Sequence, residues 1–192
     1  RYQDDYPVIP SFDIKLSEIT QMDNIIIVGT NITKEFPILS VYLRNAQKIK
    51  STNIYSFSTY EFEENFSLDK NFVMSSSDID EFFNNSGILP SFNIDKSKKN
   101  LVIIGPAMSY LSNYSNILNS VSKFSKSINS KLALLGDQAN TAGAWAMGII
   151  PHRLPGGDNL RKSEDRDYEL ISDRDELLII YNLEPEYDFS ND

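Results

Sequence analysis

The stretch of sequence that decides the fold is Asn24–Val28, which reads NIIIV and runs directly into Gly29. Its apolar residues are continuous rather than alternating, which is typical of a strand buried on both faces of a parallel sheet. The same design recurs at 100–104, 132–135 and 175–180, where each aliphatic run meets a turn. A weaker, alternating run covers 53–58. These runs predict four strands of a parallel sheet and a weaker fifth.

Amphipathic helical patterns lie between the predicted strands. Apolar residues recur at spacings of three and four over 35–49 and again over 108–128, as one buried face of a helix requires. Pro37 falls in the first turn of the first pattern, a favoured position for proline. A shorter helix is predicted to begin near Ser77 and to end near Phe83. The alternation predicts an α/β fold with a doubly wound, mostly parallel, Rossmann-like sheet and right-handed crossovers.

The 192 residues are interpreted as a single α/β domain that spans 1–192. Residues 59–98 are rich in Asn, Ser, Phe and acids, and they are predicted to form an irregular excursion with little catalytic content. Residues 155–173 are predicted to form a long charged loop before the last strand. The pattern indicates no second core with a boundary of its own.

The chain has no cysteine, one histidine and a formal net charge of −9. The absence of cysteine excludes a disulfide scaffold, a thiolate-bound zinc or iron–sulfur site, and a cysteine nucleophile. The negative charge argues against a nucleic-acid-binding protein and against a polybasic membrane anchor. Residues 158–192 hold 12 acids and 4 bases, and therefore carry −8 of the net charge. A solvated face or loop is the favoured interpretation of this acidic stretch, and a docking surface is the alternative.

No apolar run approaches the roughly 20 residues that a membrane-spanning helix requires, so we expect no direct membrane insertion. The chain starts at Arg1 and not at methionine, and it begins without a hydrophobic leader. We expect it to be a processed chain or a piece of a longer one.

Ligands of an open parallel sheet bind beyond the carboxyl ends of its strands. Four turns are predicted to lie there, at 29–31, 105–107, 136–140 and 182–185. None contains the Gly-x-Gly-x-x-Gly of a dinucleotide fingerprint or the Gly-Lys-Ser/Thr of a phosphate loop. Their glycines are interpreted as allowing tight turns between strand and helix. The acids that follow the last predicted strand are interpreted as capping or solvating its end: Glu184, Glu186 and Asp188.

Two stretches after the 132–135 run contain unusual residues. Small residues crowd around Trp145, the only tryptophan, and a packed core indole is favoured there over a stacking platform. His152 and Arg153 could bind an anion, and His152 could act as a general base. A lone histidine without a nucleophile is more often structural, so a histidine-based metal site is not expected. An all-carboxylate site for a hard cation stays open, although no acids have EF-hand spacing.

Three segments of the chain resemble a known family. The first is DNIIIVGTN at 23–31, with EFPIL at 35–39 and LRNA at 43–46. The second is ANTAGAW at 139–145, with Gly148, PHR at 151–153 and GG at 156–157, and the third is LLII at 177–180 through LEPEYD at 183–188. In this order they resemble the molybdopterin-oxidoreductase-like domain in the large iron–sulfur subunit of NADH-quinone oxidoreductase. That subunit lies in the peripheral arm of respiratory complex I, and the second segment resembles its bacterial form.

The resemblance implies the Rossmann-like α/β domain of molybdopterin enzymes, within an internal or C-terminal piece of a much longer subunit. It implies that the iron–sulfur clusters are held by a Cys-rich N-terminal part of that subunit, so we expect no cofactor in the chain itself. In true molybdopterin enzymes this type of domain binds the pterin nucleotide, whereas the complex I relative is not thought to use molybdenum. The implied partners are other subunits of the peripheral arm, on the cytoplasmic face of the bacterial inner membrane.

One departure from the family bears on phosphate binding. Relatives often have a Pro-Arg pair after the Gly-Thr-Asn turn, and this chain has Ile32 and Thr33 there. The loss of a cation beside this turn weakens the case for a bound phosphate. We therefore assign no catalytic, cofactor-binding or metal-binding residue.

Three hypotheses about function remain open. The leading one is a non-redox structural domain of the large iron–sulfur subunit of complex I, whose parent complex transfers electrons from NADH to quinone. The second is the pterin-nucleotide-binding domain of an active molybdopterin oxidoreductase, with the nucleotide held by the turns near Asn31, Asn140 and Glu184. The third is a free-standing α/β domain that binds a small ligand.

Overall fold

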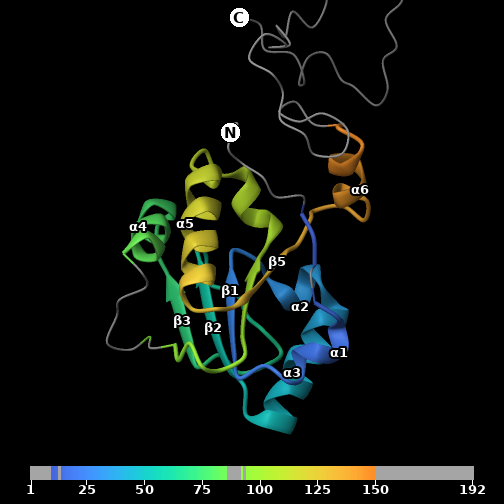
Figure 1. Ribbon diagram of the computed structural model, residues 1–192, viewed down its shortest axis with the longest axis vertical. Helices are drawn as coiled ribbons and strands as arrows, with labels where there is room; N and C mark the ends of the chain where they lie inside the picture. The colour runs from blue at the N-terminus through green and yellow to red at the C-terminus, as the bar shows by residue number, and fades with distance from the viewer. Residues whose placement is uncertain (1–9, 13, 86–91, 93, 150–192) are drawn as a thin grey trace, which may run out of the picture. The chain divides into compact units, whose positions relative to one another are not determined.

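The structure is a computed structural model in which residues 10–12, 14–85, 92 and 94–149 are described (Figure 1). These residues form a five-stranded sheet with the order β3-β2-β1-β4-β5, and every neighbouring pair of strands is parallel. The strands are β1 (Asn24–Val28), β2 (Asn53–Ser58), β3 (Lys70–Val73), β4 (Asn100–Ile104) and β5 (Lys131–Leu134). The predictions at 24–28, 53–58, 100–104 and 132–135 are confirmed, and the predicted strand at 175–180 lies outside the described residues.

The sheet is doubly wound, as predicted. From β1 the chain adds β2 and β3 on one side, and then returns to add β4 and β5 on the other side. The order of the strands therefore reverses between β1 and β4, which is the point where open α/β sheets bind ligands. All five residues of β1 and of β4 are buried, as their continuous aliphatic runs indicate.

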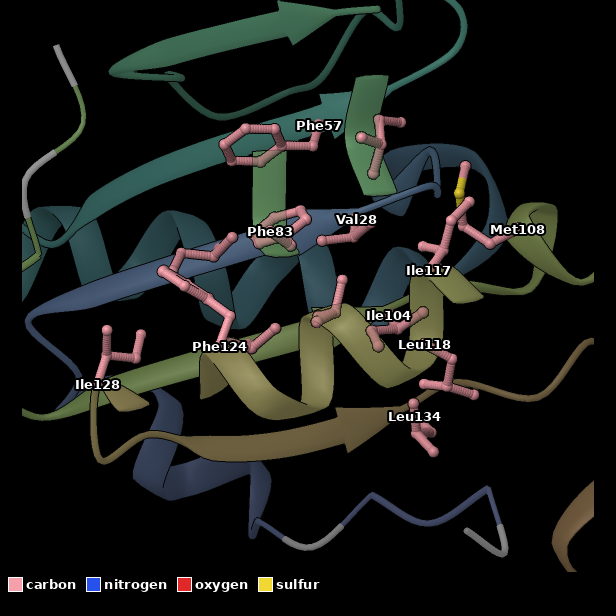
Figure 2. Packing of buried hydrophobic residues seen from close by; sticks show 14 of the residues in the cluster. Val28, Phe57, Phe83, Ile104, Met108, Ile117, Leu118, Phe124, Ile128 and Leu134 are labelled. Atoms are coloured by element: carbon pink, nitrogen blue, oxygen red, sulfur yellow. The ribbon is translucent and has the colours of Figure 1, made fainter. Parts of the chain in front are cut away.

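Helices cover both faces of the sheet (Figure 1). One face packs against α1 (Leu16–Ile19), α2 (Ile32–Glu35) and α3 (Pro37–Lys50), through a core that includes Ile25, Ile27 and Leu43. The other face packs against α4 (Ser76–Asn84) and α5 (Tyr114–Ser127), through a core that includes Val28, Phe57 and Phe124 (Figure 2). None of the described helices is long and apolar enough to cross a membrane.

The structure confirms the first long helical pattern and divides the second. The pattern over 35–49 corresponds to α3, but α2 forms a separate turn before it because Phe36 leaves helical geometry, with φ −135° and ψ 64°. The predicted helix over 108–128 is confirmed for 114–127, which form α5, and is wrong for its first part. This range consists of the 3₁₀ helix η1 (Pro106–Tyr110) and α5, separated at Leu111, where the backbone is extended. The predicted short helix near Ser77 is confirmed as α4, with Ser75 capping the Asp78 N–H at 3.2 Å.

The segment 59–98 contains β3 as well as the predicted short helix α4, so the prediction of an irregular excursion is wrong at β3. Strand β3 escaped prediction because its four residues, KNFV, supply little apolar pattern and lie at an exposed edge of the sheet. The charged loop predicted at 155–173 lies outside the described residues.

An asparagine ladder joins the amino ends of the three central strands. The side chain of Asn24 donates to Asn100 Oδ1 at 2.8 Å, and Asn53 donates to Asn24 Oδ1 at 3.1 Å. These three residues are direct partners in the strand register. In this alignment the Asn24 amide is bonded through both its nitrogen and its oxygen, so the ladder favours the observed register over a one-residue slip.

An ion pair lies beside the ladder. Lys50 Nζ lies 2.8 Å from Asp23 Oδ1, and the Lys99 backbone N–H donates to Asp23 Oδ2 at 2.9 Å. The hydrogen bond from Lys50, followed by the one from Lys99, lowers the pKa of Asp23 below its ordinary value. The carboxylate therefore stays ionised and joins the end of α3 to the start of β1.

Candidate functional site

The carboxyl edge of the sheet, between β1 and β4, is the candidate functional site. The fold brings the turn 29–31, which follows β1, beside the turn 105–107, which follows β4. The Gly105 N–H donates to Val28 O at 2.8 Å, so the segments that follow β1 and β4 begin to diverge only beyond this bond. In related topologies this is the position where a nucleotide approaches the sheet.

The two glycines at this edge make room for the protein's own side chains. A Cβ on Gly29 would lie 2.2 Å from Met108 Cγ, and Gly29 has a φ of +65°. A Cβ on Gly105 would lie 2.1 Å from Thr30 Cβ. Met108 and Thr30 are both only 1% exposed. Figure 2 shows Met108 beside the loop that follows β1. The close approach that glycine permits here is therefore to Met108 and Thr30.

A carboxylate from the segment between β2 and β3 closes the start of α2. Glu64 Oε1 accepts from the Ile32 N–H at 2.8 Å, and Glu64 Oε2 accepts from the Thr33 N–H at 2.8 Å. The Thr33 hydroxyl also donates to Glu64 Oε2. Glu64 thus bonds to the backbone N–H groups at the start of α2, which are the groups that a bound anion would use.

A second carboxylate, Glu35, binds the turn itself. Glu35 Oε2 accepts from the Thr30 hydroxyl at 3.0 Å, and Glu35 Oε1 accepts from the Asn31 N–H at 3.0 Å. Asn31 Oδ1 caps the Lys34 N–H at 3.1 Å. The backbone donors of residues 31–34 therefore all have partners within the chain.

The turn after β5 is also filled by local side chains. A Cβ on Gly136 would lie 2.6 Å from Thr141 Cβ, and the Thr141 hydroxyl donates to Asp137 Oδ1 at 3.1 Å. A Cβ on Gly143 would lie 2.1 Å from Asn140 Oδ1. The small residues of this stretch thus permit contacts within the turn and within α6 (Thr141–Ala146).

Trp145, on α6, is buried with 8% of its surface exposed, which agrees with a packed indole, and its place in a core stays a prediction. The remaining sequence candidates, His152, Arg153 and Glu184, lie outside the described residues. In the described part of the chain, no three His, Cys, Asp or Glu side chains are grouped so that they could hold a metal ion.

Glu64 could not be found from the sequence. It lies 31 residues from Thr33, within a segment that lacks a recognisable pattern, and nothing local in the sequence connects it to the turn after β1. Glu35 could have been found, because an acid shortly after a strand-end turn can bind the donors of that turn.

Comparison with protein families decides the membership of the chain. The model of the molybdopterin oxidoreductase family matches residues 6–164, a range that includes the whole described sheet. The chain belongs to the molybdopterin oxidoreductase family. No curated protein matches the chain significantly. The predicted fold class agrees with both the family and the five-stranded parallel sheet.

Membership of this family implies a pterin nucleotide as cofactor. The hydrogen-bond donors of the turn after β1 show whether this turn could hold the phosphates of such a nucleotide. The backbone N–H groups of residues 31–34 are all bonded to side chains of the protein, two of them to Glu64 and one to Glu35. A phosphate at this turn would need unpaired donors, and these N–H groups offer none. The residues of this turn do not fit a phosphate group in the described conformation.

Replacing Glu64 with glutamine tests whether its charge closes the start of α2. We expect Glu64→Gln to lower the free energy of unfolding by about 1–2 kcal/mol, because an amide oxygen accepts more weakly than a carboxylate and the amide nitrogen faces a second donor. The measurement is urea unfolding of the full chain. Glu63→Gln, at an exposed neighbour, removes the same charge and should change stability by less than about 0.5 kcal/mol. Equal effects of the two substitutions would contradict this role of Glu64.

Proposed function

We propose that the chain is a non-redox structural domain of the large iron–sulfur subunit of NADH-quinone oxidoreductase. The parent complex transfers electrons from NADH to quinone, and this domain contributes folding, packing and contacts with other subunits. Membership in the molybdopterin oxidoreductase family supports the proposal at the level of the superfamily. The three ordered segments that resemble the complex I protein, together with the absence of cysteine, favour that protein within the superfamily.

The observation that carries the proposal is the closure of the turn after β1 by Glu64 and Glu35. Both carboxylates bond to backbone donors of the turn, so the chain satisfies these groups without a ligand. A domain that retains the fold of a cofactor-binding protein but fills its strand-end turn in this way is suited to a packing role. The proposal assigns the domain to the peripheral arm, on the cytoplasmic face of the bacterial inner membrane, against other subunits of the complex.

The second candidate function is the cofactor-binding domain of an active molybdopterin oxidoreductase. The family match over 6–164 is equally compatible with it. This function requires Glu64 and Glu35 to leave the turn after β1, or the nucleotide to bind through other strand-end turns.

One preparation separates the two functions. The full-length native protein that contains this chain is isolated from membranes through an affinity tag, and its molybdenum and tungsten contents are measured. Native electrophoresis with an NADH-dependent activity stain is run on the same preparation. We expect an NADH-oxidising complex that contains several subunits and iron, and in which molybdenum and tungsten are far below one atom per chain.

A stoichiometric content of molybdenum or tungsten would overturn the structural assignment and support the second function. Migration of the tagged chain apart from any NADH-oxidising complex would overturn the assignment to complex I.

A further inference from the structure

A concave surface lies between α3 and the segment 64–67. It is a cavity of about 550 Å³ lined by polar and charged side chains and by Phe66. It is open to solvent, and Arg44 and Lys48 are both exposed on its rim. Its lining residues are Arg44, Gln47, Lys48, Glu64, Asn65, Phe66 and Ser67.

Hydrogen bonds fix the wall formed by 64–67 against the helices. Gln47 Nε2 donates to Ser67 O at 2.5 Å, and the Ser67 N–H donates back to Gln47 Oε1 at 3.1 Å. The Asn65 N–H donates to Thr33 Oγ1 at 2.9 Å, and the Ser40 hydroxyl donates to Asn65 Oδ1. Phe66 is 8% exposed and anchors the segment in the core beneath α3. The wall is therefore preorganised before a ligand binds, which reduces the entropy cost of binding.

The cavity carries two positive charges that no described acid pairs with. Arg44 and Lys48 are four residues apart on α3, so they lie on one side of the helix within one turn of each other. Within the part of the chain that the structure describes, the ion pairs are Lys50–Asp23 and Lys131–Glu18, and neither involves these two residues. The one acid in the lining, Glu64, is committed to the start of α2 by its three hydrogen bonds.

The donor set has the chemistry of an oxyanion site. Arg44 offers a planar fork of N–H donors and Lys48 offers a mobile ammonium, a combination that suits phosphate oxygens. The Asn65 amide nitrogen and the Ser67 hydroxyl add neutral donors from the opposite wall. Arg44 and Lys48 lie one helical turn apart and face the segment 64–67 across the cavity. Both side chains can therefore bind the same multiply charged group.

We propose that the cavity between α3 and 64–67 binds a small phosphorylated ligand, with Arg44 and Lys48 as the residues that hold its phosphate. The site is separate from the turn after β1, and it stands whether the domain serves complex I or another oxidoreductase. Glu64 links the two places, because its carboxylate closes the start of α2 while its residue lines the cavity.

The test uses the full chain, with inorganic phosphate and pyrophosphate as probes. Isothermal titration measures affinity at low and at high ionic strength, and backbone amide chemical shifts locate the binding. We expect saturable binding that weakens with salt, with shifts concentrated at residues 44–48 and 64–67. We expect R44Q/K48Q to weaken pyrophosphate binding by about tenfold or more, as the loss of charge-assisted hydrogen bonds predicts.

A matched control is available on α5. Lys123 and Lys126 are exposed on that helix, so K123Q/K126Q removes the same net charge away from the cavity. This variant should bind pyrophosphate within about twofold of the unaltered chain. Equal weakening in both double variants would mean non-specific charge attraction and would overturn the site.

Two further outcomes overturn the proposal. One is the absence of saturable binding of either probe up to about 10 mM. The other is binding of a hexaglutamate peptide at Arg44 and Lys48 without binding of pyrophosphate, which would make the surface a contact for an acidic polypeptide.

Discussion

Replacement of Phe57 by alanine is expected to lower the free energy of unfolding by about 3–5 kcal/mol, because it removes a fully buried ring and leaves a cavity. Phe57, on β2, lies at the centre of an aromatic group. Its ring centroid lies 4.6 Å from that of Phe72, 4.9 Å from that of Phe82 and 5.0 Å from that of Phe83. The loss therefore weakens the packing of both β3 and α4 on β2. Chemical unfolding of the full chain, followed by circular dichroism, measures the effect.

Phe72→Ala is the matched control for this experiment. Phe72 belongs to the same aromatic group but is only half-buried, on the edge strand β3. We expect it to cost about 1–2 kcal/mol, since a partly exposed ring loses less burial on truncation. A cost for Phe57→Ala no larger than that for Phe72→Ala would contradict the central place of Phe57 in this core.

Gly29→Ala is expected to lower the free energy of unfolding by about 2–4 kcal/mol. The new methyl group would lie 2.2 Å from Met108 Cγ, so Met108 must move within a packed core. The positive φ of +65° adds about 1 kcal/mol of backbone strain for alanine. The measurement is urea unfolding at a fixed temperature.

Two variants separate these causes. Gly148 also has a positive φ, +70°, so Gly148→Ala serves as the control for backbone strain and should cost about 1 kcal/mol. Met108→Ala removes the side-chain atoms that the new methyl group would meet. Addition of Gly29→Ala to this background should therefore lower the free energy of unfolding only by the backbone strain, about 1 kcal/mol. If Gly29→Ala costs the same with and without Met108, then the glycine does not serve the packing of Met108.

The sheet was largely predictable because burial on both faces leaves a mark in the local sequence. Strands β1 and β4 must be apolar at nearly every position, and β2 keeps enough alternating apolar residues to be recognised. Edge strand β3 carries no such constraint, so its sequence resembles a loop. The sixth-strand candidate at 175–180 has a similar aliphatic pattern but lies outside the described residues.

The division of the helical pattern over 108–128 was not predictable from periodicity. Leu111 and Tyr114 both pack partly buried against the core, so the apolar spacing continues across the extended residue that separates η1 from α5. The spacing of apolar residues indicates which residues are buried. It does not change when the helical backbone is interrupted at a single residue such as Leu111.

The closed turn was only half predictable. The sequence indicated that the turn after β1 lies at the ligand-binding edge. The presence of Ile32 and Thr33, where the resemblance to the complex I protein leads us to expect a Pro-Arg pair, weakened the case for phosphate there. The closure itself depends on Glu64, which reaches the turn only through the tertiary fold. Long-range contacts of this kind leave no spacing rule in a single sequence.

The asparagine ladder can be completed only after β4 has been synthesised. One of its two bonds joins Asn24 to Asn100, which are 76 residues apart in the chain. A ribosome adds residues from the amino end, so β1 emerges first, β2 follows, and β4, the other neighbour of β1, emerges later. Until residues 100–104 have emerged, one edge of the most apolar strand stays open to intermolecular pairing. The nascent chain is therefore most exposed to aggregation over the interval between the emergence of β1 and that of β4.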